Sequence, residues 1–267
     1  MLNSFSGPDL PRRLICNADD FGLSPDTNRG IIKCRQEGIL TSASLMVRAP
    51  AAAAAAQYAT TDQSFSLGLH VELGEWEYRA GEWVQTAEVV PLDRPMAVRD
   101  EICRQVDTFA KLTGKNPTHL DSHQHVHQHH SVKPVMRELA DTMGIVLRGD
   151  SSLVRFWGAF FGLDEHMESK PENVSVANLL QLLDQLQPGI TEMSCHPGLD
   201  SSLNAVYSTQ RLLEVATLCD PLIIQAIRDK AIVLVPFVPI PRHGSSTANS
   251  QPATPSQFFS PSGQRLP

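Results

Sequence analysis

The sequence contains no long hydrophobic run. A membrane-spanning helix needs about 18 to 20 consecutive apolar residues, and no apolar stretch of the chain approaches that length. The first residues, MLNSFSGPDLPRR, also lack the apolar core of a signal peptide. We therefore predict a protein that makes no contact with membranes and resides in the cytoplasm.

Cysteine is scarce and follows no binding pattern. The five cysteines are Cys16, Cys34, Cys103, Cys195 and Cys219. Their number is odd, their spacing is wide and no C-x-x-C occurs, which argues against a disulfide framework and against a cysteine zinc site. Cys16 and Cys195 lie within apolar runs, so we predict that both are buried thiols.

Basic residues are fewer than acidic residues. The chain has 22 Lys and Arg against 29 Asp and Glu, for a formal net charge of −7. No basic face is evident, so we do not expect nucleic-acid binding. The apolar fraction of 42% is ordinary for a globular enzyme. The length of 267 residues suits one large α/β domain, which we place at residues 13–242 after an extension at 1–12.

The last stretch, residues 243–267, is rich in Ser, Pro, Gln and Thr. Its apolar content is too low to form a core, so we predict a disordered tail. Truncation near Gly244 is then expected to leave activity intact.

Apolar runs alternate along the chain with helix-like patterns. Strands are predicted at residues 13–19, 40–47, 65–73, 145–149, 190–197 and 232–237, and residues 118–127 are predicted to be a strand or the end of one. Helices are predicted at residues 25–37, 50–58, 96–113, 132–143, 174–186 and, as one helix or two, 206–230. Residues 74–96 are predicted to be a long loop and residues 150–173 to be irregular. Such alternation indicates a parallel sheet, either open or closed into a barrel.

Polar residues gather where the predicted strands end. They are Asp19 and Asp20, His70 and Glu72, Asp121 with His123 and His125, Arg148, and His196. The carboxyl ends of parallel strands form the active face of α/β folds, so these side chains are expected to converge. Acids and imidazoles from separate strands would make a metal site there. A cation would also compensate the two acids that end the first hydrophobic strand.

The chemistry of such a cluster fits a single divalent ion. Two imidazoles and one carboxylate leave coordination positions open for water and substrate. A second carboxylate is free to act as general base. Asp19 and Asp20 would point to opposite faces of a regular strand. At a strand end that turns through Gly22, both can reach one site and perform different tasks.

The segment THLDSHQHVH, residues 118–127, has a period of two. As a strand it places His119, Asp121, His123, His125 and His127 on one face. At about 3.3 Å per residue these five side chains span too far to bind one ion. One or two are expected to ligate the ion, and others to orient the ligands.

Each of these residues also has a simpler interpretation. Asp19 and Asp20 could cap a helix and form a turn, and His70 could be a hydrogen-bonded core histidine. The six histidines between positions 119 and 130 could bind metal adventitiously or lie in a partly solvated loop. His196 could shape a turn, and Arg148 could pair with an acid. Trp76 and Trp83 could be packing residues or a sugar platform. The joint pattern favours the functional interpretation.

Four motifs together resemble the YdjC-like carbohydrate deacetylases, a family that includes chitooligosaccharide deacetylases. They are NADDFG at 17–22, GLH at 68–70, THLDSHQHVH at 118–127 and CHPG at 195–198. The resemblance extends from about Arg13 to Phe237 and keeps the order of the family's motifs. Two departures are Gln128-His129-His130 after the histidine motif and Val71-Glu72-Leu73-Gly74 after GLH. Both lie where a substrate loop would begin, and so concern the substrate more than the reaction.

The resemblance implies a distorted (β/α) barrel of about seven parallel strands in a single domain, an N-acetyl sugar substrate and hydrolytic release of acetate. By position, it implies that Asp20, His70 and His123 hold the metal, usually magnesium in this family. Asp19 would be the general base and His196 the general acid. We add three candidate substrate contacts, His125, Arg148 and Trp76. A homodimer is also expected from the resemblance.

The metal and the reaction both have alternatives. Imidazole ligands suit zinc, manganese, cobalt or nickel better than magnesium. The same site could also serve a metal-dependent amidohydrolase or phosphoesterase acting on a non-sugar substrate, or the chain could be a non-catalytic sugar-binding barrel. Asp19 favours an enzyme, because a binding module needs no base beside its metal.

Overall fold

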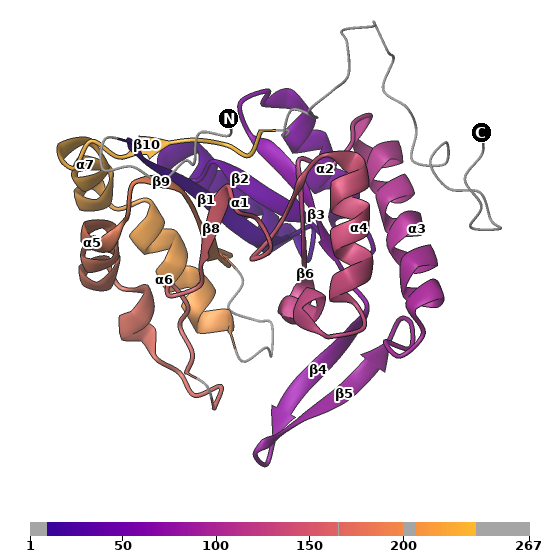
Figure 1. The fold of residues 1–267 in the computed structure, drawn as a ribbon. Helices are drawn as coiled ribbons and strands as arrows, with labels where there is room; N and C mark the ends of the chain where they lie inside the picture. Colours follow the sequence, from indigo (N-terminus) through magenta and orange to yellow (C-terminus); the bar gives the residue numbers. More distant parts are fainter. Residues whose placement is uncertain (1–9, 165, 200–206, 239–267) are drawn as a thin grey trace, which may run out of the picture.

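A central strand, β1 (Arg12–Phe21), organises the fold. It is buried without interruption from Leu14 to Phe21, as expected for a strand that is covered on both faces. The computed structural model describes residues 10–164, 166–199 and 207–238 (Figure 1). In it, β1 pairs with β9 along one edge, and with β10 and then β2 along the other.

The main sheet has eight parallel strands in the order β7-β6-β3-β2-β1-β9-β8, with β10 beside β1. Besides β1, they are β2 (Ser42–Leu45), β3 (Ser66–Val71), β6 (His119–Ser122), β7 (Val146–Leu147), β8 (Val154–Trp157), β9 (Gly189–Cys195) and β10 (Val233–Leu234). Neighbouring strands follow the chain order around the sheet, as in a (β/α) barrel. Within the described residues no pairing joins β7 to β8, so the barrel is incompletely closed. The predicted distorted barrel is confirmed.

Helices connect most of these strands and cover the sheet from outside (Figure 1). They are α1 (Pro25–Glu37), α2 (Ala52–Thr61), α3 (Pro95–Thr113), α4 (Lys133–Met143), α5 (Val176–Gln185), α6 (Ser208–Leu218) and α7 (Pro221–Asp229), with short 3-10 turns at His123–Gln128 and Pro171–Val174. Ser24 caps α1 by accepting a hydrogen bond from the Thr27 backbone at 3.0 Å. The helices agree with the predicted ones to within a few residues.

Three predicted segments were wrong. Residues 74–96 contain an antiparallel hairpin, β4 (Gly74–Arg79) and β5 (Glu82–Glu88), that extends from the barrel (Figure 1). Residues 150–173 include strand β8, which pairs with β9. The strand predicted at 118–127 stops at Ser122, and the chain then turns into the 3-10 segment.

Other expectations concern single features. Within the described residues, no helix combines the length and the apolar character needed to cross a bilayer. All five cysteines are free, and Cys16 and Cys195 are buried as predicted. The predicted tail at 243–267 lies outside the described residues.

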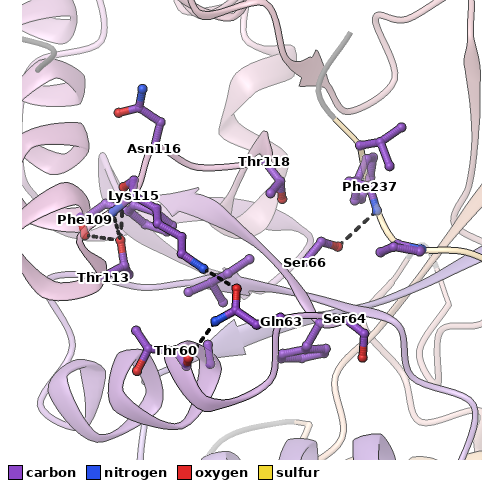
Figure 2. Close-up of a pocket in the computed structure, with 15 residues that line it drawn as sticks. Thr60, Gln63, Ser64, Ser66, Phe109, Thr113, Lys115, Asn116, Thr118 and Phe237 are labelled. Atoms are coloured by element: carbon purple, nitrogen blue, oxygen red, sulfur yellow. Dashed lines mark hydrogen bonds between the residues drawn. The ribbon is translucent and has the colours of Figure 1, made fainter. Parts of the chain in front are cut away.

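A cavity of about 250 Å³ lies at the amino-terminal ends of β3 and β6 (Figure 2). Ser66, Thr118 and Phe237 border it, and a backbone N–H of Phe237 donates to the Ser66 hydroxyl at 3.0 Å. Among the described lining residues Lys115 is the charged one, and none is an acid or a histidine. The acids and imidazoles are gathered at the opposite, carboxyl-terminal ends of the strands.

Candidate active site

The end of β1 brings two adjacent carboxylates into one site. Asp20 adopts a left-handed backbone, with φ of 63°, and the pairing of β1 with β2 shifts register between Ala18 and Phe21. This irregularity breaks the alternation that would send neighbouring side chains to opposite faces. Asp19 and Asp20 therefore border the same cavity, as the sequence predicted for a turning strand end.

Strand β3 supplies His70, and the glycine two residues before it has a packing role. A Cβ atom added at Gly68 would lie only 2.4 Å from the His119 imidazole. That imidazole is buried, stacks on Phe237 at 3.8 Å and lies 3.0 Å from the Ser44 hydroxyl. The GLH motif thus requires glycine because a histidine from the neighbouring strand packs against its backbone.

The histidine-rich segment does not stay extended. Gln124 and His125 both have left-handed backbone conformations, with φ of 51° and 54°. The Gln124 side chain bonds to both backbone groups of Trp76, accepting from its N–H at 3.0 Å and donating to its carbonyl at 2.8 Å. The predicted single face from His119 to His127 is therefore wrong beyond Ser122, because this contact with the hairpin redirects the chain.

Asp20, His70 and His123 form a compact cluster. Asp20 Oδ1 lies 3.3 Å from His70 Nε2 and 3.1 Å from His123 Nδ1. The three ligand atoms all lie within 4.8 Å of one another. One carboxylate and two imidazoles are a donor set that divalent transition metals favour. The residues fit a metal ion.

Carboxylates orient both imidazoles of this cluster. Asp121 Oδ1 lies 2.8 Å from His70 Nδ1, and Glu75 Oε2 lies 3.1 Å from His123 Nε2. Histidine ligands of metals usually have such partners on the second ring nitrogen. Asp121 was among the residues expected to orient ligands. Glu75 was missed because it lies in the hairpin that was predicted to be a loop.

The charges of the cluster also suit a cation. Burial lowers the pKa of His70, but Asp121 and the hydrogen bond to Asp20 outweigh it and raise the pKa to about 10. Burial likewise lowers the pKa of His123, while its bonds to Asp20 and Glu75 raise it to about 9. Without an ion the acids therefore hold two imidazoles protonated. A divalent cation supplies the same two positive charges.

Asp19 belongs to a second, fully buried charge cluster. Arg148 donates to its two carboxylate oxygens at 2.6 and 2.7 Å, and also contacts Asp121 and Glu192 at 2.7 Å each. Burial raises the pKa of Asp19, but the Arg148 guanidinium outweighs it and the pKa is lowered. Asp19, His70 and Asp121 also form a compact ligand group. Arg148 contacts both carboxylates of this group, whereas Asp20 directs Oδ1 at the two imidazoles, so the group with Asp20 is the better cation site.

His196 follows β9 and faces Asp19. Its Nε2 lies 3.7 Å from Asp19 Oδ2, and its Nδ1 is buried with no hydrogen-bond partner within the described part of the chain. Burial lowers the pKa of His196 to about 4. A Cβ added at Gly30 would lie 2.5 Å from Gly198, so the CHPG loop packs directly on α1.

Helix α6 contributes residues that the strand-end argument missed. Arg211 forms an ion pair with Asp20 and donates to the His196 carbonyl at 3.2 Å. Glu214 accepts hydrogen bonds from the His196 backbone and from the Tyr207 hydroxyl. The available signal was a pair of charged residues three positions apart in a predicted helix.

A cavity of about 270 Å³ lies at this site. The structure brings together the five residues predicted for metal binding and catalysis, Asp19, Asp20, His70, His123 and His196, and places His125 beside them. Arg148 is not among the described lining residues, because its side chain lies fully buried behind Asp19. Trp76 borders a neighbouring groove instead.

Fold and site together define a (β/α) barrel with an Asp-His-His cluster at the carboxyl ends of its strands. Solved structures share the fold. A protein of Enterococcus faecalis V583 described as a cellobiose-phosphate cleavage protein is 22% identical, with a TM-score of 0.67 over 85% of this chain and 98% of that chain. A peptidoglycan N-acetylglucosamine deacetylase is 16% identical, with a TM-score of 0.53 over 87% of this chain and 89% of that chain.

The family model for YdjC-like proteins matches residues 13–229, so the chain belongs to the YdjC-like family. A carbohydrate deacetylase of Geobacillus stearothermophilus is 30% identical over 249 residues, covering 85% of this chain and 98% of the relative. A chitooligosaccharide deacetylase of Serratia marcescens is 31% identical over 266 residues, covering 85% and 99%. The resemblance drawn from the motifs is confirmed.

Proposed function

We propose that the chain is a metal-dependent deacetylase that removes the N-acetyl group from acetylated sugars. One observation carries the proposal: a buried carboxylate, Asp19, adjoins the Asp20-His70-His123 cluster in one cavity. The deacetylase names of two relatives with near-complete coverage support the choice of reaction and substrate class.

Asp20, His70 and His123 would hold the ion. When bound, it would polarise the acetamide carbonyl and lower the pKa of the attacking water. Two imidazole ligands favour zinc, manganese, cobalt or nickel over magnesium. Asp121 and Glu75 would fix the orientation of the two ligating rings.

Asp19 accepts a proton from the attacking water as general base. Arg148 keeps that carboxylate ionised and fixes its orientation through two hydrogen bonds, so we assign Arg148 to positioning of Asp19 rather than to substrate contact. His196 is neutral at rest, and its Nε2 faces Asp19 at 3.7 Å. Through one intervening water, His196 would receive the proton from Asp19 and donate it to the departing nitrogen. The C–N bond breaks, leaving acetate and a free amine.

The test is product analysis with the purified full chain and added divalent metal. We expect equal amounts of acetate and free amine from N,N′-diacetylchitobiose. An N-acetylated amino acid and a phosphate monoester, incubated in parallel, should give no product. Hydrolysis of either in place of the sugar would support an amidohydrolase or a phosphoesterase. Sugar binding without any product would indicate a non-catalytic barrel.

Glu75→Gln is expected to weaken divalent metal binding by about 10- to 100-fold, the usual effect of removing a partner of a ligating imidazole. Calorimetric titration of the full chain with Zn²⁺ measures the affinity. Glu77→Gln is the matched control, because Glu77 lies on the same strand, is exposed and pairs with Arg79. Equal affinities in the two variants would show that Glu75 does not orient His123.

A further inference from the structure

A groove runs beside the catalytic cavity, between the β4–β5 hairpin and the histidine-rich turn. Its volume is about 650 Å³, against about 270 Å³ for the cavity. Gln124 and His125 line both, so the groove and the cavity adjoin. Pockets for small molecules usually measure about 300 to 1,000 Å³. The catalytic cavity alone falls just below this range, so a longer ligand must extend out of it.

One face of the hairpin presents aromatic side chains to this groove. The cross-strand pairs are Trp76 with Gln85 and Tyr78 with Trp83. Cross-strand partners, and residues two apart on one strand, share a face of the ribbon. All four side chains therefore lie on the same face. Trp76, Trp83 and Gln85 line the groove, and Trp83 is 52% exposed.

The hairpin is fixed relative to the cavity rather than merely close to it. Gln124, next to the proposed ligand His123, bonds to the backbone N–H and carbonyl of Trp76 and donates to Glu75 at 2.9 Å. Tyr78 packs edge-on against Trp83, with ring centroids 5.5 Å apart, and holds the indole in place. A preformed aromatic surface loses little conformational entropy when a ligand binds to it.

Polar residues also line this groove. Besides Gln85 they are Glu88, Asp93, Gln124, His125, His129 and His130. A pyranose ring has an apolar C–H face that can stack on indole and a rim of hydroxyl groups that need hydrogen-bond partners. A groove that combines indole rings with carboxylates, amides and imidazoles matches both requirements.

We propose that this groove is a second sugar subsite, in which Trp83 is the stacking platform. It holds the neighbouring pyranose of an oligosaccharide while the cavity holds the residue that loses its acetyl group. This inference rests on the proposed deacetylase function and assigns recognition of the neighbouring sugar to Trp83. Trp83 would determine specificity for chain length and take no part in the chemistry.

The test compares acetate release from N-acetylglucosamine and from N,N′-diacetylchitobiose. Trp83→Ala is expected to lower kcat/KM for the disaccharide about 10-fold, the scale of one lost aromatic contact. The value for the monosaccharide should stay within about twofold. Trp83→Phe should restore most of the disaccharide value. Val84→Ala is the control, because Val84 pairs with Glu77 on the opposite face and is 42% exposed. It should resemble the wild type.

A second experiment, on sugar binding, distinguishes failure of this inference from failure of the proposed function. Calorimetry measures binding of both sugars to Asp19→Asn with and without Trp83→Ala. If Trp83→Ala lowers the affinity for the disaccharide and not for the monosaccharide, the subsite is supported even when the wild type releases no acetate. The absence of acetate would reject only the deacetylase function. Unchanged disaccharide binding and turnover in Trp83→Ala, equal losses for the two sugars, or no disaccharide binding at all would overturn the subsite.

Discussion

Asp19→Asn is expected to lower kcat for acetate release by about 100- to 10,000-fold, the range that a general base contributes. The amide has nearly the same shape as the carboxylate but cannot accept the proton of the attacking water. Arg148 keeps its contacts with Asp121 and Glu192, so the fold should persist. Steady-state acetate release at saturating sugar measures the effect.

Metal content distinguishes a lost base from a lost ion. Asp19→Asn should bind one divalent ion per chain as the wild type does, whereas Asp20→Asn should lose both the ion and the activity, because Asp20 belongs to the ligand cluster. If Asp19→Asn kept wild-type kcat with its ion bound, another group would be the base and the assignment of Asp19 would be wrong.

Arg148→Met is expected to destabilise the protein by about 3 to 5 kcal/mol, the usual result of removing one partner from a buried ion pair. Asp19, Asp121 and Glu192 would lose their shared cation while their carboxylates stay buried. Urea unfolding followed by circular dichroism measures the change in the free energy of unfolding.

Arg99→Met is the matched control for this loss. Arg99 also makes a two-bond contact with a carboxylate, that of Glu138, at 2.8 Å each, but Glu138 is 60% exposed. Exposed pairs contribute about 0 to 1 kcal/mol, so this variant should remain close to wild type. A similarly small change in Arg148→Met would mean that the buried carboxylates take up protons without cost and that Arg148 does not hold the site together.

The strand ends of the site could be predicted because they follow a local rule. A buried apolar run that ends in acids or imidazoles is visible in the sequence, and parallel strands bring such ends to one face. One cavity is lined by the four residues predicted in this way, Asp19, Asp20, His70 and His196. His123 also reached it, although through a turn and not along an extended strand.

The hairpin could not be predicted from burial, because every residue of β5 is exposed. In the structure Ala80 and Gly81 form a two-residue connection with positive φ at both positions, as a tight hairpin turn requires. The sequence signals this turn only weakly, because alanine stands where asparagine, aspartate or glycine is usual. Glu75 and the redirection at Gln124 depend on contacts between the hairpin and the turn. Such contacts join residues about fifty positions apart, and no local pattern records them.

The role of Arg148 also could not be predicted from the sequence. Its three carboxylate partners lie on β1, β6 and β9, far apart along the chain. A strand-end arginine is compatible with substrate binding and with ion pairing alike. Only the packing of the strands shows that its guanidinium is enclosed behind Asp19.

The most direct test of metal-dependent deacetylation at this site measures metal content and acetate release on the same samples. The full chain is stripped with a chelator and titrated with Zn²⁺, Mn²⁺, Co²⁺, Ni²⁺ or Mg²⁺ in the presence of N,N′-diacetylchitobiose. We predict that activity rises in proportion to bound metal up to one ion per chain. His70→Ala should bind no ion and release no acetate, whereas His166→Ala, which removes an exposed histidine outside both the cluster and the groove, should behave as wild type. Full activity in the stripped protein, or metal binding that depends on His166 and not on His70, would contradict metal-dependent deacetylation at this site.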